Sequence, residues 1–107
     1  MLRHVVVMRF LAGTPPEAVE AVEAGLAELP ARIAEVRAFA FGRDAGLAAG
    51  NADLAVVADF DDAAAYASYA AHPAHVELVA TRIRPILAER SAVQFLLDGD
   101  GRVGVGR

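Results

Sequence analysis

The sequence contains no cysteine, which excludes disulfide bonds, thiolate metal ligands and cysteine nucleophiles. It has no apolar run long enough to cross a membrane, and its start lacks a basic segment followed by a long apolar one. We therefore expect a cytoplasmic protein with no membrane partner. Lysine and arginine form no run and the net charge is −4, so the sequence lacks the cationic surface that nucleic-acid binding requires.

What the sequence does contain is apolar material for one domain. Hydrophobic residues make up 56% of the 107 residues, which is enough for a substantial core. We expect this domain to span residues 1–98. Residues 99–107 form a glycine-rich tail without a pattern of residues to bury.

Strands are predicted where β-branched and aromatic residues cluster between turn residues. The expected strands are Leu2–Phe10, Val36–Phe41, Leu54–Phe60 and Ala92–Leu97. In the first of them, alternation places His4, Val6 and Met8 on one face. The same alternation places Val5 and Val7 on the other face.

The first helix is expected between the first two strands. Thr14-Pro15-Pro16-Glu17 has the spacing of a capping box with proline at the first helical position. Apolar residues then recur at helical intervals until Pro30, where the helix is predicted to end. Gly25 is a weak point in this helix, since glycine costs about 1 kcal/mol relative to alanine.

Two further helices are expected before the last strand. Asp61 or Asp62 caps an alanine-rich helix that runs to about Ala71, and Pro73 begins the next one. Pro85 should bend or break this second helix. Its predicted apolar stripe consists of Val76, Val79, Ile83 and Ile86.

This order of elements predicts an α+β fold, a split βαβ arrangement with a four-stranded antiparallel sheet and helices on one face. The strands carry apolar residues on both faces, although a sheet covered on one side only should be polar on the other. A second copy of the same sheet is the simplest cover. We therefore predict a homodimer whose sheets close on each other.

The residues most capable of chemistry lie close together at one helix start, in the segment Tyr69-Ala-Ala-His72-Pro73-Ala-His75. Proline at the first helical position makes His72 the expected N-cap and places His75 in the first turn, where the helix dipole favours a neutral imidazole. A neutral His75 can act as a base, and Tyr69 can donate a hydrogen bond to an enolate or alkoxide oxygen. Structural roles are open for each: backbone bonding for His75 and core packing for Tyr69.

These residues resemble a known family. Arg3-His4-Val5-Val6, the Phe-Gly-Arg-Asp turn at residues 41–44 and Tyr69-x-x-His72-Pro73-x-His75 are similar to the stress-responsive dimeric α/β-barrel (Dabb) domain family over residues 2–98. The resemblance implies a ferredoxin-like fold that dimerises sheet to sheet. One branch, the polyketide cyclases, performs an aldol condensation. There the positions of Tyr69 and His75 are catalytic and that of His4 lines the pocket.

Three functions follow from these observations. The first is binding of a small apolar or polyketone-like molecule without turnover, with His4, Val6, Met8 and His72 as candidate binding residues. The second is a cofactor-free cyclase or lyase that uses Tyr69 as hydrogen-bond donor and His75 as base. The third is a cofactor-independent monooxygenase, which only fold-level analogy supports. Convergence of the tyrosine and histidines on one open cavity would favour the enzyme.

A metal site is a weaker alternative. His72 and His75 could form half of one, with Asp59, Asp61 or Glu77 as a third ligand. A proline-initiated turn, however, does not place residues 72 and 75 as an i, i+4 pair would. We therefore expect no metal and no cofactor in the mechanism, although some members of the family hold a Mg²⁺ ion near the dimer interface.

Overall fold

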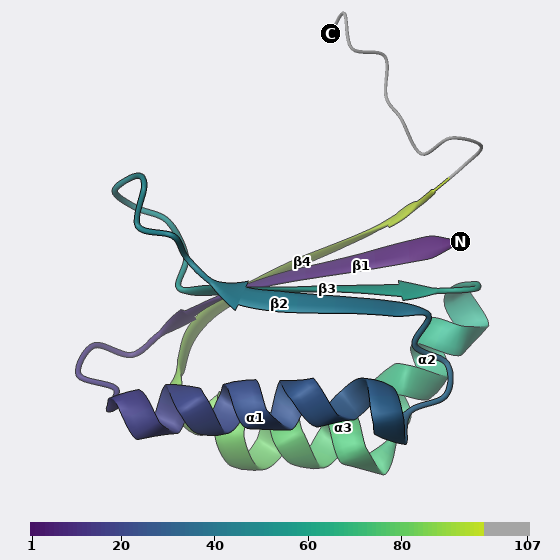
Figure 1. Ribbon diagram of the computed structural model, residues 1–107, viewed down its shortest axis with the longest axis horizontal. Helices are drawn as coiled ribbons and strands as arrows, with labels where there is room; N and C mark the ends of the chain where they lie inside the picture. Colours follow the sequence, from purple (N-terminus) through teal and green to yellow (C-terminus); the bar gives the residue numbers. More distant parts are fainter. Residues whose placement is uncertain (98–107) are drawn as a thin grey trace, which may run out of the picture.

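An antiparallel sheet with helices on one face forms the described part of the chain, residues 1–97 of a computed structural model (Figure 1). The elements are β1 (Leu2–Phe10), α1 (Pro16–Arg32), β2 (Ala38–Arg43), β3 (Leu54–Phe60), α2 (Ala63–Ala71), α3 (Pro73–Leu78) and β4 (Leu87–Leu96). The predicted tail and the domain boundary at residue 98 lie outside the described residues.

The strand order β2-β3-β1-β4 is that of a split βαβ fold, with β1 in the interior of the sheet. Every pairing is antiparallel, and β1 has β3 on one side and β4 on the other. The fold class expected from the sequence is therefore confirmed. Burial follows the predicted alternation in β1: His4, Val6 and Met8 are buried on the helix side, whereas Val5 and Val7 are half-buried on the outer side.

The core lies between the inner face of the sheet and the helices. Its largest fully buried side chains are Phe60, Leu29, Ile33, Leu54 and Val22. Each contributes roughly 1.5–3 kcal/mol relative to an exposed position. Because β3 and α1 supply all but one of these residues, the packing of α1 on the sheet fixes the height of the space beneath the helices.

Helix α1 differs from its prediction at both ends. The Thr14 side chain does not cap the helix but donates a hydrogen bond from Oγ1 to the carbonyl of Leu11, and Pro15 is the N-cap. The capping box was therefore wrong. The helix also continues through Pro30 to Arg32, because a proline in the last turns removes a single backbone bond that tertiary packing can offset.

Two strand boundaries also differ from their predictions. β4 begins at Leu87 rather than Ala92, because its pairing with β1 continues to Phe10 despite the polar residues Glu89 and Arg90. Its last residue is Leu96. β2 spans Ala38–Arg43 rather than residues 36–41, because its register with β3 begins opposite Asp59.

The segment after Pro73 changes its helical pitch twice. α3 is followed by a π-helical turn, Val79–Ile83, and a 3₁₀ turn, Arg84–Ile86. Pro85 sits inside the last turn and has no N–H to continue the α-helical pattern, so the predicted break is found there. The predicted apolar stripe was wrong in one member, since Val76 is 51% exposed and α3 buries Ala74 and Leu78 instead.

Gly25 marks a close approach of α1 to α3. A Cβ added there would overlap Cδ1 of Leu78 and would come within 3.2 Å of the Arg82 guanidinium. The same guanidinium donates a hydrogen bond to the carbonyl of Ala21 at 2.9 Å. The glycine predicted to weaken the helix therefore allows the two helices to pack closely.

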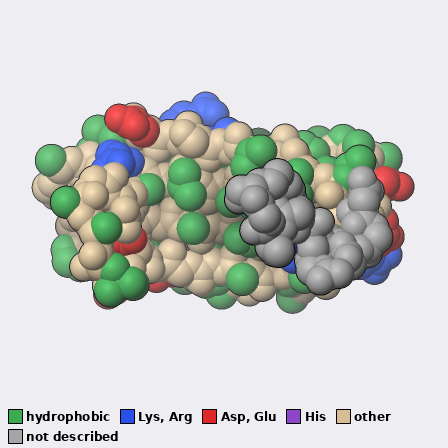
Figure 2. All heavy atoms as spheres, turned by 90° about the horizontal axis from the view of Figure 1, so that it is seen from above, with side chains coloured by type: hydrophobic (Ala, Val, Ile, Leu, Met, Phe, Trp, Pro, Cys, Tyr) green, Lys and Arg blue, Asp and Glu red, His purple; other side chains and the backbone are tan. Residues whose placement is uncertain are grey.

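The outer face of the sheet carries an apolar row that crosses all four strands. The row consists of Ala40, Val57, Val5 and Val93, which lie opposite one another in register. Val93 is 55% exposed, and Phe95 next to the row is 43% exposed. Figure 2 shows this face, with charged side chains mostly toward its margins.

None of the helices within residues 1–97 combines the length and the hydropathy needed to span a bilayer.

Candidate active site

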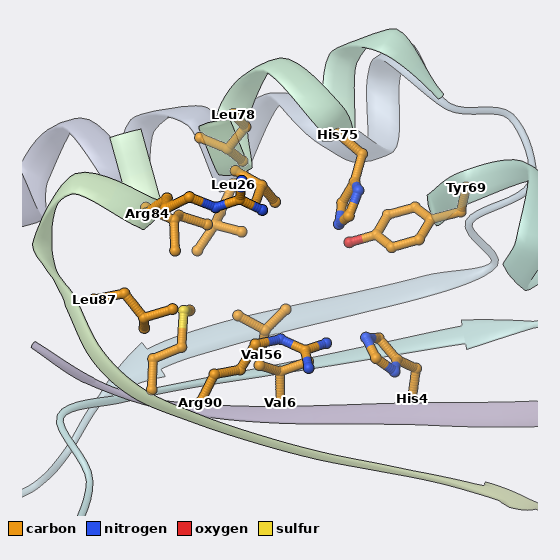
Figure 3. Close-up of a pocket in the computed structure, with 13 residues that line it drawn as sticks. His4, Val6, Leu26, Val56, Tyr69, His75, Leu78, Arg84, Leu87 and Arg90 are labelled. Carbon is orange, nitrogen blue, oxygen red and sulfur yellow. The ribbon is translucent and has the colours of Figure 1, made fainter. Parts of the chain in front are cut away.

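A cavity of about 350 Å³ opens between the inner face of the sheet and the helices (Figure 3). Its apolar lining consists of Val6, Met8, Leu26, Val56, Leu78, Val79, Ile83 and Leu87. Its polar lining consists of His4, Tyr69, His75, Arg84 and Arg90. A largely apolar cavity with a few convergent polar groups is typical of a small-molecule site.

His75 enters the cavity from the first turn of α3. Its Nδ1 lies 3.1 Å from the carbonyl oxygen of Ala70. Because a carbonyl can only accept, Nδ1 carries the proton in the neutral ring and Nε2 keeps a free lone pair. Burial lowers the pKa of His75, the Ala70 carbonyl opposes this shift and Arg90 reinforces it. The ring is therefore neutral at pH 7, as the sequence predicted. The main cause is burial rather than the helix dipole.

Tyr69 lies beside His75 at the end of α2. The two ring centroids are 4.6 Å apart, and Phe60 supports the other side of the phenol at 4.9 Å. Figure 3 shows the hydroxyl pointing toward His75. Burial, with a smaller contribution from Tyr66, raises the pKa of Tyr69 to about 12. The phenol therefore keeps its proton at neutral pH and is a hydrogen-bond donor.

His4 faces the same cavity from the central strand. The side-chain amide of Gln94, opposite it on β4, donates a hydrogen bond from Nε2 to Nδ1 of His4 at 2.7 Å. The proton of the neutral ring therefore resides on Nε2. Burial first, then Arg90 and His75, lower the pKa of His4 to about 4. Its tautomer is the reverse of that of His75, so one ring is a donor and the other a base.

His72 does not line the cavity. It is the C-cap of α2 and the N-cap of α3, and its Nδ1 accepts a hydrogen bond from the backbone N–H of Ala74 at 3.0 Å. The structure therefore does not support the prediction that His72 binds substrate. It does place His72 at the predicted N-cap position. Residues 1–97 also contain no group of three side chains that could hold a metal ion.

The other sequence candidates lie where they were expected, and the structure adds three residues. Val6 and Met8 form the sheet side of the cavity. Gln94, Arg84 and Arg90 were missed. Alternation along β4 would have placed residue 90 on the inner face, but the strand was predicted to begin only at residue 92. Residue 94 lay inside the predicted strand, but its pairing with His4 depends on the register with β1.

A family model described as the stress responsive A/B barrel domain matches residues 2–96. No curated protein matches the chain. Among solved structures, a dimeric ferredoxin-like protein of unknown function from Thermobifida fusca is 47% identical, with a TM-score of 0.82 and coverage of 88% of each chain. A protein from Arabidopsis thaliana is 31% identical, with a TM-score of 0.75 and coverage of 90% of this chain and 94% of that one.

A hydroxynitrile lyase from Passiflora edulis is 18% identical, with a TM-score of 0.77 and coverage of 88% of this chain and 90% of that one. At this identity the likeness shows the fold alone. The same holds for a dimeric protein of ferredoxin-like fold from Bacteroides fragilis, which is 21% identical with a TM-score of 0.78 and coverage of 88% and 93%.

Proposed function

The chain belongs to the stress-responsive A/B barrel domain family, and from this premise we propose that it acts as a homodimer that binds a small polyketone-like molecule in the cavity beneath its helices. We further propose that Tyr69 and His75 catalyse a cofactor-free, aldol-type cyclisation of that molecule. The observation that carries the proposal is the convergence of both side chains, together with His4, on one cavity.

The protonation states of the three side chains suit chemistry on a carbonyl compound. His75 offers a lone pair on Nε2 because its other nitrogen is held by Ala70. Tyr69 and His4 each offer a proton toward the cavity, the former because burial raises its pKa and the latter because Gln94 occupies its Nδ1. A base and two donors around one cavity are the groups that enolisation requires.

The reaction can be written without a cofactor. Nε2 of His75 takes a proton from the carbon between two carbonyl groups, and the electron pair of that C–H bond moves to a carbonyl oxygen. Tyr69 donates a hydrogen bond to the resulting enolate oxygen. The enolate carbon then forms a C–C bond with a distant carbonyl carbon of the same molecule. The alkoxide produced there takes the proton back from His75, which restores the neutral base.

The apolar walls supply the conditions for this reaction. Val6, Met8 and Leu26 are apolar lining residues, and a ligand packed against them has less water around it, which strengthens the hydrogen bond to the enolate. A confined cavity also favours the folded conformer in which the two carbons meet.

The homodimer is supported by the outer face of the sheet. The row of Ala40, Val57, Val5 and Val93 leaves an apolar surface on the side opposite the helices. Solved relatives with the same fold, including the Thermobifida fusca protein, are described as dimeric. A two-fold interface on this row would bury it in both copies without covering the cavity.

The test is turnover of linear poly-β-ketones, supplied as free acids and as thioesters, with cyclic product followed by mass spectrometry. His75→Ala should lower the rate of cyclisation by about 10²–10⁴-fold, which is the range of a general base. Tyr69→Phe should lower it by about 10²-fold, which is typical of one lost oxyanion donor.

Glu77→Gln is the matched control, because Glu77 lies on the same helix but is exposed and lies outside the cavity. It should leave turnover unchanged. A wild-type protein that binds these compounds without converting them would remove the catalytic part of the proposal. Equal rates in the wild type and His75→Ala would remove His75 from it.

A further inference from the structure

The charge of the cavity is unbalanced. Arg84 and Arg90 are among the residues that line it, and no aspartate or glutamate is. Arginine stays protonated under all physiological conditions. The two histidines that share the cavity are neutral at pH 7 because the pKa of each is lowered, so they contribute no charge. Within the described residues, the lining therefore carries two positive charges and no counter-charge.

The other arginines of the described chain either have partners or lie away from the cavity. Arg3, Arg37 and Arg43 form ion pairs with carboxylates. Arg9 and Arg82 donate hydrogen bonds to backbone carbonyls. Arg32 is exposed at the end of α1, away from this cavity. Arg84 and Arg90 differ from all of these because they combine a cavity position with the absence of an ion pair within residues 1–97.

Arg84 and Arg90 reach the cavity from opposite walls. Arg84 belongs to the 3₁₀ turn that follows the π-helical turn, and Arg90 belongs to β4 opposite Met8. Figure 3 shows both side chains extending along the cavity toward the end that holds His4, Tyr69 and His75. The influence of Arg90 reaches that end, since its charge lowers the pKa of each of these three residues.

We propose that Arg84 and Arg90 bind a carboxylate of the ligand, so that the cavity selects keto acids over neutral ketones. This proposal rests on the proposed function for the identity of the cavity and adds the class of ligand. Both arginines are exposed residues whose side chains also line the cavity, so a ligand that fills it displaces water from the cavity-facing side of each guanidinium group. A neutral apolar ligand leaves those N–H donors unpaired, which is costly, whereas a carboxylate replaces the lost water with charge-assisted hydrogen bonds.

The geometry of arginine favours this class of ligand. A guanidinium presents parallel N–H donors that match the two oxygens of a carboxylate, and two such groups on facing walls can hold one anion between them. The carboxylate would then anchor one end of a chain whose ketone carbons lie toward His75. The same positive charges would favour the enolate that forms there.

The test uses two probes of nearly equal shape, 4-butylbenzoate and 4-butylbenzamide, with dissociation constants measured by isothermal titration calorimetry. The wild type should bind the benzoate about tenfold or more tightly than the amide, as expected for charge-assisted pairs. Arg84→Gln and Arg90→Gln should each remove several-fold of this preference. The double variant should bind both probes equally, and amide affinity should change little throughout.

Arg32→Gln is the matched control, because it removes the same charge outside the cavity. It should keep the full preference. Arg90→Lys keeps the positive charge but loses the paired N–H donors of the guanidinium. It should retain part of the preference, which would show that the cavity of this variant is still folded.

Three results would overturn the proposal: equal affinity of the wild type for both probes, a preference that survives the double variant, or a loss in Arg32→Gln as large as in Arg90→Gln. Tighter binding of 4-butylphenyl phosphate than of the benzoate would overturn the assignment to a carboxylate. His75→Ala should keep the preference for the benzoate. A failure of the cyclase proposal is therefore distinguishable from a failure of this one.

Discussion

The two faces of strand β1 differ in the kind of surface to which they contribute. Its even-numbered residues, among them His4, Val6 and Met8, face the helices and line the cavity. Its odd-numbered residues Val5 and Val7 belong to the opposite face, where the apolar row crosses the sheet. Because successive residues of a strand point to opposite faces, neighbouring residues of β1 belong either to the cavity or to the apolar outer surface.

The difference lies in what each face does with polar groups. The inner face holds the buried histidine and its glutamine partner, with protonation states set by burial. On the outer face, Arg3 donates two hydrogen bonds to the carboxylate of Asp59, and neither side chain lines the cavity. A polar group therefore marks the ligand site only where its partner leaves one donor or acceptor directed at the cavity.

The largest expected effect comes from placing a charge in the apolar row. Val57→Asp puts a carboxylate next to Val5 in each copy, and burying two unpaired carboxylates costs several kcal/mol. We expect the dissociation constant of the proposed homodimer to rise by about 10³-fold or more. Size-exclusion chromatography with light scattering at micromolar concentration measures this.

Val57→Thr is the control for that variant, because it keeps the shape of the side chain and adds no charge. It should remain dimeric. A Val57→Asp protein with an unchanged dimer mass would contradict the assignment of the outer face to association.

The assignment of β1 residues to the two faces of the sheet could be predicted from the sequence, and so could the start of α3 at Pro73. Alternation in β1 and the proline-initiated turn are local patterns. Both are present in the structure, with His72 as the N-cap and His75 at the cavity, although His72 was also predicted to bind substrate and does not line the cavity. β4 is different, because Glu89, Arg90 and Ser91 are exposed at a sheet edge and carry no apolar alternation. Its start is decided by pairing with β1, a contact between residues far apart in the chain. Arg90 was missed for that reason. Gln94 lay inside the predicted strand, but its pairing with His4 depends on the register between β4 and β1.

Gly25 shows the same limit for helices. Intrinsic propensity ranks glycine as a weak point, and nothing in α1 itself reveals that Leu78 lies against it. The capping box at Thr14 failed similarly, since Pro15 is the N-cap and the Thr14 hydroxyl donates to the carbonyl of Leu11. Local patterns predict which residues a face contains, whereas packing between distant elements decides what those residues touch.

The second prediction concerns pH and the buried inner face. The pKa of His4 is about 4 in the folded protein and near 6.5 in an unfolded chain. Between these values the unfolded state binds more protons, so the free energy of unfolding falls as pH is lowered from 6.5 to 4. The full loss is about 3 kcal/mol. Urea denaturation at pH 7 and at pH 5 should show about half of this loss.

His4→Gln provides the comparison, since it removes the titrating ring while a side-chain amide can still pair with Gln94. Its stability should fall less between pH 7 and pH 5 than that of the wild type. Since the pKa of His75 is also lowered, some pH dependence should remain. Parallel losses in both proteins would show that His4 is not the buried group responsible.

The smallest expected effect separates the two neighbouring histidines. His72→Asn should change the free energy of unfolding by less than about 0.5 kcal/mol, because asparagine can accept the same hydrogen bond from the N–H of Ala74. His72→Ala, which cannot, should lose about 1 kcal/mol. Both variants should bind 4-butylbenzoate as the wild type does, since His72 is not part of the cavity lining. Weaker binding by His72→Asn at unchanged stability would return His72 to the ligand site and would extend the inner surface beyond the cavity.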